Sequence, residues 1–159
     1  MLLLSVSFWN CEKDDLCAED TPVTPQLIIE FYDEADRTLL KNVSKLVVFN
    51  TAFPSNPTFD ADAVSKFTIP LETSKTSTTF NFGLNINDGD DANDLADVIT
   101  FNYSKDDIYI SRACGYKTIF TLNENNPIVK TVVDDWIKGF DVIQPSINNQ
   151  NETHVKIYF

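Results

Sequence analysis

Carboxylate and amide oxygens gather in one short stretch of the chain, residues 85–97, which reads NINDGDDANDLAD. Such oxygens are the ligands that calcium prefers in proteins. The residues that would bind the ion are Asp88, Asp90, Asp91 and Asp94, with Asn93 and Asp97 beside them. Their spacing does not match the twelve-residue calcium-binding loop, which requires glycine at position 6 and glutamate at position 12. The stretch therefore predicts either a calcium site or a solvated acidic hairpin loop.

Residue types that serve in catalysis are present, but the chain has no Walker loop, dinucleotide fingerprint or nucleophile elbow. His154 is the only histidine, so a typical zinc site or a catalytic triad would depend on it. A Cys114–His154 pair is one alternative, and two carboxylates for sugar hydrolysis among the 24 acidic residues are another. Arg112 would bind a carboxylate or a sugar, or pair with one of these acids. We expect His154 on the solvated face of a strand, and we predict no enzyme.

The first ten residues, MLLLSVSFWN, carry no charge and run directly into Cys11. A bilayer-spanning helix needs about 20 apolar residues, whereas the apolar core of a signal peptide needs about 7 to 15. The run resembles a bacterial lipoprotein signal, in which the cysteine is acylated and becomes the first mature residue. A basic region precedes such a core, so we expect the signal peptide at residues 1–10 to be truncated at its start. A buried first strand is the alternative.

Glu12, Lys13, Asp14 and Asp15 follow the candidate lipidated cysteine. This pattern resembles the short signal that sends lipoproteins of the Bacteroidetes to the outer face of the outer membrane. A charged tether that keeps a linker solvated has the same composition. We predict a lipid-anchored protein of the outer membrane, exposed on the cell surface, with the periplasmic face as the alternative location.

The number of cysteines bears on their pairing, because the chain has three: Cys11, Cys17 and Cys114. If Cys11 carries lipid, two remain, and an exported chain favours a disulfide between them. That bond would close a loop of roughly 100 residues, which the chain-entropy model equates with about 4.7 kcal/mol of stability. Two buried free thiols are the second interpretation, and Cys114 as a nucleophile is the third.

The chain carries a net charge of −12, which sets limits on its partners. Nucleic acid phosphates need basic patches, so we predict no nucleic acid partner. The acidic chain does not attract anionic lipid headgroups either, and we expect no membrane contact beyond the lipid anchor. Residues 11–25 are predicted to form an acidic tether ending in TPVTP, and residues 26–159 are long enough for one domain with a substantial core.

Alternation of apolar and polar residues predicts short strands throughout this domain. The segments are QLIIEFYD, SKLVVFN, KFTIPL, TTFNFGLNI, DVITFNYS, DIYISRA, YKTIFTLN and THVKIYF. Pro70 restricts KFTIPL to a sheet edge or a bulge. A further strand is expected from Trp136 onward, whereas Ile128 to Asp135 fits a helix or a strand. Eight or nine strands with at most one short helix predict an all-β, antiparallel two-sheet sandwich, immunoglobulin-like or related.

Four segments together, CEKDDLC, TPQLIIEFYD, SRACGYKTIF and HVKIYF, resemble a family of small Bacteroidetes lipoproteins of unknown function. The resemblance runs from Cys11 to Phe159 and implies export, lipidation and a β-rich domain, but it supplies no activity. The leading functional hypothesis is a non-catalytic envelope lipoprotein that binds a protein or glycan partner. The second is an accessory subunit of an outer-membrane assembly that accepts a partner strand. The third is a hydrolase with paired carboxylates.

Overall fold

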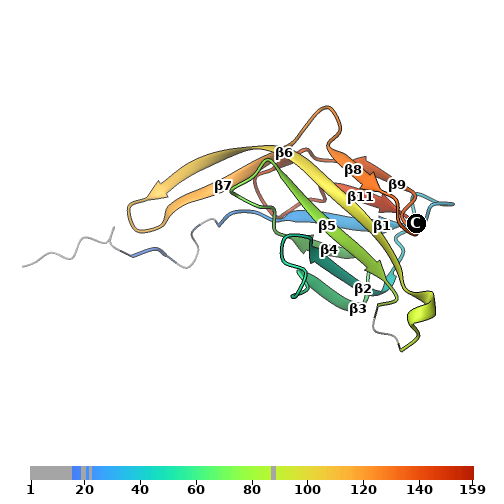
Figure 1. Ribbon diagram of the computed structural model, residues 1–159. Helices are drawn as coiled ribbons and strands as arrows, with labels where there is room; N and C mark the ends of the chain where they lie inside the picture. The colour runs from blue at the N-terminus through green and yellow to red at the C-terminus, as the bar shows by residue number, and fades with distance from the viewer. Residues whose placement is uncertain (1–15, 19–20, 22, 87–88) are drawn as a thin grey trace, which may run out of the picture.

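The computed structural model describes residues 16–18, 21, 23–86 and 89–159, and it consists of two packed β-sheets (Figure 1). The predicted all-β two-sheet sandwich is confirmed. Besides strands, the described residues form one 3₁₀ helix of three residues, η2 (Asp91–Asn93). Among these residues, no helix has the length and apolar character needed to cross a bilayer.

The smaller sheet has four strands and holds the C-terminal strand in its middle. Their order is β4 (Lys66–Ile69), β1 (Leu27–Tyr32), β11 (Val155–Tyr158) and β9 (Gly139–Val142). β1 and β11 run parallel, with Ile29 opposite Val155, whereas the other neighbours are antiparallel. A parallel pair needs a long connection between its strands, and here almost the entire domain provides it.

The larger sheet has seven strands and includes the longest one, β6. Its order is β10 (Ser146–Ile147), β7 (Gly115–Leu122), β6 (Leu95–Ser111), β5 (Ser77–Leu84), β2 (Val43–Asn50) and β3 (Phe59–Val64), and β8 (Ile128–Thr131) also pairs with β6. β7 and β8 share one edge of β6, because β8 pairs with residues 98–101 and β7 with residues 103–111. All strand pairs in this sheet are antiparallel.

The core lies between the sheets and is rich in phenylalanine. Alternate residues of β1 and β5 point into it, and Phe31, Phe80 and Phe82 are fully buried. The ring of Phe31 stacks on that of Phe67 at 5.5 Å between centroids, and Phe67 meets Phe82 edge to face at 6.2 Å. Each such side chain contributes about 1.5–3 kcal/mol through burial, so the alternating pattern that predicts the strands also supplies their cohesion.

Two predicted strands, 97–104 and 107–113, are one continuous strand of 17 residues, β6. The sequence suggested a break because Ser104, Lys105 and Asp106 are polar. They are polar because β6 leaves the sandwich at this point, and residues 106–109 are exposed. The prediction for Pro70 is confirmed, since β4 is an edge strand and ends one residue earlier.

The segment left open between helix and strand begins as a strand. β8 covers Ile128–Thr131, residues 132–138 have no regular structure, and β9 begins at Gly139. The predicted strand from Trp136 onward is therefore wrong for residues 136–138. The physical reason is the buried carboxylate of Asp97, around which this segment bends.

Candidate functional site

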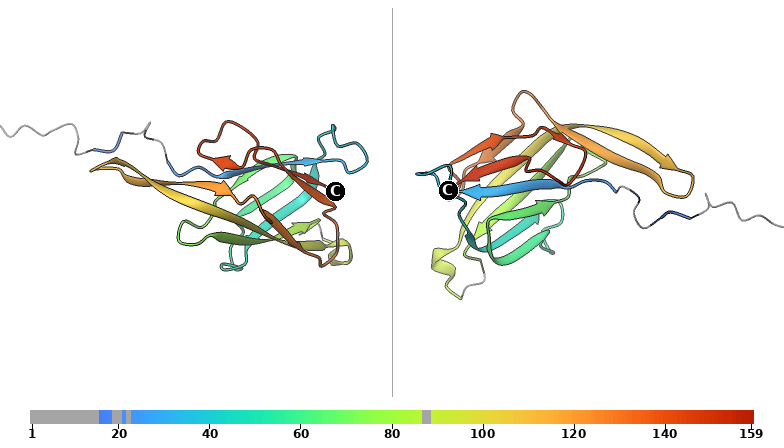
Figure 2. Two further views of the ribbon diagram at one scale, coloured as in Figure 1. Left: turned by 90° about the horizontal axis from the view of Figure 1, so that it is seen from above. Right: turned by 180° about the vertical axis from the view of Figure 1, so that it is seen from behind.

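β6 and β7 continue beyond the sandwich as a two-stranded hairpin, which we call the arm and define as residues 106–119. Its register pairs Asp106 with Ile119 and Tyr109 with Tyr116, and it shifts between Tyr109 and Ser111 near the tip. The arm projects from one end of the molecule, and the C-terminus lies at the other end (Figures 1 and 2). Thr118 is the one buried residue of the arm. Both faces of this hairpin are therefore largely exposed.

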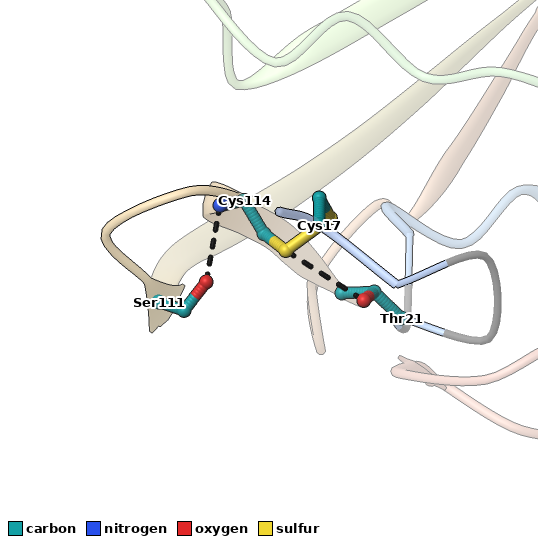
Figure 3. The surroundings of a disulfide bond; sticks show 4 residues. All are labelled: Cys17, Thr21, Ser111 and Cys114. Atoms are coloured by element: carbon teal, nitrogen blue, oxygen red, sulfur yellow. Dashed lines mark hydrogen bonds between the residues drawn. A yellow bond between two sulfur atoms is a disulfide. The ribbon is translucent and has the colours of Figure 1, made fainter. Parts of the chain in front are cut away.

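A disulfide bond joins the tip of the arm to the N-terminal segment. The predicted pairing of Cys17 with Cys114 is present, across a sequence separation of 97 residues (Figure 3). The amide of Cys114 donates to the hydroxyl of Ser111 at 3.1 Å, and the hydroxyl of Thr21 lies 3.6 Å from the Cys114 sulfur. The interpretations of Cys114 as a free thiol or a nucleophile are wrong, because its sulfur is already bonded.

The N-terminal segment then runs along the outer edge of β7. The amide of Thr118 donates to the hydroxyl of Thr24 at 3.0 Å, which closes part of that edge. A cavity of about 250 Å³ remains between the segment and the arm, with Ala18, Val23 and Ile110 among its lining residues. The segment that carries Cys17 is thus fixed to the arm by one covalent bond and by polar contacts.

The opposite edge of the arm, on β6, is open. β5 pairs with β6 as far as Asn102, and the amide of Tyr103 donates to the carbonyl of Thr76 at 2.9 Å. Beyond that point, no strand among the described residues pairs with this edge. Unpaired backbone groups on an exposed edge are able to bind an added strand.

Apolar side chains are exposed around the tip of the arm. The exposed fractions are 58% for Tyr109, 69% for Tyr116 and 85% for Leu16, which stands next to Cys17. The two tyrosine rings meet edge to face at 5.3 Å. Arg112 and Lys117 lie in the same region, and neither forms an ion pair with another described residue. The alternative in which Arg112 pairs with an acid is thus not found among these residues.

The described part of the acidic stretch, residues 89–97, lies at the end of the sandwich away from the tip of the arm (Figure 2). Asp90 precedes η2, and its carboxylate accepts the amide of Ala92 at 3.1 Å, while Asp91 lies within η2 and Asp94 follows it. Asp88 is outside the described residues. In the part of the chain that the structure describes, no three or more His, Cys, Asp or Glu side chains lie together so that they could hold a metal ion. The calcium site stays a prediction.

Asp97, at the end of this stretch, has a different role. It is fully buried, and its carboxylate accepts three backbone amides, those of Val133 and Asp135 at 3.0 and 3.1 Å and that of Ile137 at 3.0 Å. Asp135 has a φ of 56°, a left-handed conformation that turns the chain around the carboxylate. The indole of Trp136 donates to the carbonyl of Phe82 at 3.0 Å. Asp97 thus organises the loop between β8 and β9.

His154 is buried, so the prediction that it lies on a solvated strand face is wrong. It directly precedes β11, and its Nδ1 accepts the amide of Ile28 at 2.9 Å. Its own amide donates to the carbonyl of Ile28 at 3.0 Å. Burial lowers the pKa of His154. The histidine therefore bridges β1 to the start of β11, and the alternative of a pair with Cys114, at the tip of the arm, is not found.

The outer face of the smaller sheet carries tyrosines whose ring faces are covered by cations. The guanidinium of Arg37 lies 4.4 Å from the ring centre of Tyr158, and Nζ of Lys156 lies 4.2 Å from that of Tyr32. The hydroxyl of Tyr158 donates to Asp141 at 2.7 Å. Burial, together with this hydrogen bond, raises the pKa of Tyr158 to about 12. These contacts give the face a structural role.

An open cleft of about 520 Å³ lies between the loop after β2 and the loop after β4. Its lining combines the exposed ring of Phe53 with polar groups such as Asn50, Asn56 and Glu72. Asn50 donates to the Glu72 carboxylate at 3.3 Å, and the contact with Lys75 at 2.8 Å lowers the pKa of Glu72. The cleft thus offers an aromatic surface beside fixed polar groups, a combination suited to a polar ligand with apolar faces.

The remaining site predictions, Cys11, Glu12, Lys13, Asp14 and Asp15, fall outside the described residues. Comparison with curated proteins and with solved structures finds no match. A protein-family model matches residues 45–159, which includes Cys114 and the arm but not Cys17 or β1, and it is described as a family of unknown function (DUF6452). Because this match covers more than half of the chain, the protein belongs to the DUF6452 family.

Proposed function

We propose that this member of the DUF6452 family is a non-catalytic lipoprotein of the Bacteroidetes type, anchored in the outer membrane through Cys11 and displayed on the cell surface. The disulfide between Cys17 and Cys114 carries this proposal. Such bonds form and persist in oxidising compartments outside the cytosol. The bond also uses both other cysteines, which leaves Cys11 available for acylation. The periplasmic face of the membrane is the alternative location.

The anchor is tested by intact-mass measurement of protein extracted from membranes. We expect a mature chain that begins at Cys11 and carries the mass of its acyl chains. Cys11→Ser should lose that mass and leave the membrane fraction. A Cys17→Ser/Cys114→Ser double variant is the matched control and should remain acylated. A mature chain that begins at another residue, or a Cys11→Ser variant that still fractionates with membranes, would overturn the proposal.

Display on the surface is tested separately, because it depends on the charged residues after the anchor. Lys13, Asp14 and Asp15 are replaced together by alanine, and protease is added to intact cells. We expect the native protein to be cleaved and the variant to be protected, with equal acylation in both. Protection of the native protein in intact cells would place it on the periplasmic face instead.

The sandwich would bind a protein or a glycan, and the cleft beside Phe53 is a surface that suits a glycan. Aromatic faces pack against the apolar faces of sugars, and neighbouring amide and carboxylate groups bind their hydroxyls. Polysaccharide extracted from the same envelope serves as the probe in a thermal-shift assay. We expect Phe53→Ala to abolish the shift, and Leu40→Ala, which also removes an exposed side chain, to retain it. An equal shift in both variants would exclude the cleft.

The open edge of β6 favours a second candidate function, an accessory subunit of an outer-membrane assembly. A partner strand would add to the arm through backbone hydrogen bonds. Such a subunit should co-purify with one stoichiometric membrane protein, and Asp107→Pro should abolish that capture because proline removes a backbone donor. A binding protein for glycans would co-purify with no such partner.

The third hypothesis, a hydrolase, has no site assigned to it. A catalytic acid of a glycosidase needs a raised pKa. In contrast, hydrogen bonds and ion pairs at the surface lower the pKa of Asp33, Asp62, Glu72 and Asp135. Neither the family nor the residues described here indicate catalysis.

A further inference from the structure

The apolar tip of the arm is bonded to the N-terminal segment that follows the proposed lipidation site, Cys11. Cys17 is bonded to Cys114 at the tip, and five residues of chain separate it from Cys11. Fully extended, the six Cα-to-Cα steps from Cys11 to Cys17 span at most about 20 Å. The tip is therefore the part of the fold that the tether holds beside the bilayer, if Cys11 is acylated as proposed above.

The side chains exposed at this tip are of the kind that anchors proteins at membrane interfaces. Tyrosine is enriched there because its ring is apolar and its hydroxyl stays hydrated. Tyr109 and Tyr116 are both more than half exposed, and Leu16 is the most exposed large apolar residue of the described chain. Arg112 and Lys117 flank them, and long basic side chains extend toward water from such positions.

We propose that the tip of the arm, with Tyr109, Tyr116 and Leu16, inserts into the interfacial zone of the bilayer that holds the acyl chains. The arm then stands between the membrane and the sandwich, and the opposite end, which carries the C-terminus, faces away from the bilayer (Figure 1). The lipid anchor raises the effective concentration of the tip at the surface, so a weak intrinsic affinity is sufficient.

The driving force of this contact is the burial of apolar side chains, and not attraction to anionic lipids. The tether has acids at Glu12, Asp14 and Asp15, which offset the two basic residues near the tip. The insertion should therefore occur equally in vesicles of zwitterionic phosphatidylcholine and in vesicles that contain anionic lipid. The expectation of no membrane contact beyond the lipid anchor rests on the net charge of −12, which argues against anionic headgroups as partners. The proposed contact departs from that expectation because it is apolar.

The experiment uses the acylated chain, reconstituted into phosphatidylcholine vesicles with and without brominated acyl chains. Trp136 is buried and is the one tryptophan of the chain from Cys11 onward, so it supplies a constant background. Tyr116→Trp places a probe at the tip. Val132→Trp is the matched control, because Val132 is also exposed, at 58%, and follows β8 rather than the arm.

We expect the brominated lipid to quench the probe at position 116 and to shift its emission to the blue, with neither effect at position 132. A further Cys17→Ser/Cys114→Ser change in the Tyr116→Trp chain should reduce the quenching, because the tip is then no longer fixed to the tether. Equal quenching at positions 116 and 132 in acylated protein would refute the insertion and leave the anchor intact. Protein without acyl mass would refute the anchor itself.

Other occupants of the tip would give different results. A second copy of the chain would show as a dimer in light scattering that Tyr109→Ser/Tyr116→Ser converts to a monomer, with no quenching of the Tyr116→Trp probe. That result would overturn the membrane contact, as would capture of the tip by another protein that shields the probe from brominated lipid.

Discussion

Replacing Asp97 by alanine should strongly destabilise the fold, although the sequence places this residue in an acidic surface loop. The substitution removes the acceptor of three backbone amides. A hydrogen bond to a charged group contributes about 1.5–3 kcal/mol. Val133 and Asp135 are exposed residues whose amides are able to bind water instead, whereas Ile137 is fully buried and its amide is left without a partner. We therefore expect a loss of about 3–5 kcal/mol in the free energy of unfolding.

The assay is equilibrium unfolding in urea, followed by the fluorescence of Trp136, which lies within the same loop. Asp97→Asn should give an intermediate loss, because its amide oxygen still accepts hydrogen bonds while its nitrogen faces one of the donors. Asp106→Ala, at an exposed position of the arm, is the control and should change little. If the free energy of unfolding of Asp97→Ala lies within about 1 kcal/mol of that of the native protein, the carboxylate does not organise the loop.

Three further predictions concern the disulfide, the buried histidine and the buried tyrosine. Cys17→Ser/Cys114→Ser should lower the free energy of unfolding by about 4.7 kcal/mol in the chain-entropy model for a 97-residue separation, and reductant should then have no further effect in urea titrations. The folded pKa of His154 lies below its ordinary value of 6.5. The contribution of this group to stability should therefore be fully present above pH 6.5 and be lost as the pH falls below it. His154→Asn, which keeps an acceptor, should flatten this dependence between pH 7 and 5. The pKa of Tyr158, about 12, should fall toward 10 in Asp141→Asn when measured by NMR. In the native protein, the contribution of Tyr158 to stability should be lost as the pH rises from 10 toward 12.

The strands and their buried faces follow from local pattern, and most were predictable. In β1 and β5, apolar side chains alternate with polar ones, so a single buried face identifies the strand and its orientation. β3, which reads FDADAV, was missed because it lies at a sheet edge and buries little. The segment after Thr131 was misassigned because a carboxylate 36 residues earlier in the chain directs its path.

The same distinction between local pattern and tertiary contacts applies to the candidate site. Counting the cysteines and noting the context of Cys11 was sufficient to predict that Cys17 pairs with Cys114. The exposed tyrosines at the tip of the arm carried no local signal, since DIYISRA has the alternation of an ordinary strand. Whether such side chains lie in a core or in solvent depends on which elements pack beside them, and β5 ends before it reaches them.

The sequence by itself determined the class of fold and the location of most strands, because periodicity and composition are local properties of the chain. The number of cysteines favoured the pairing of Cys17 with Cys114 but left free thiols as an alternative. The tertiary structure alone decided that β6 extends beyond β5 to form the arm, that Asp97 and His154 are buried, and that the disulfide lies at the tip of the arm. Each of these depends on contacts between residues far apart in the chain, such as the bond between His154 and Ile28, and no local pattern encodes such contacts.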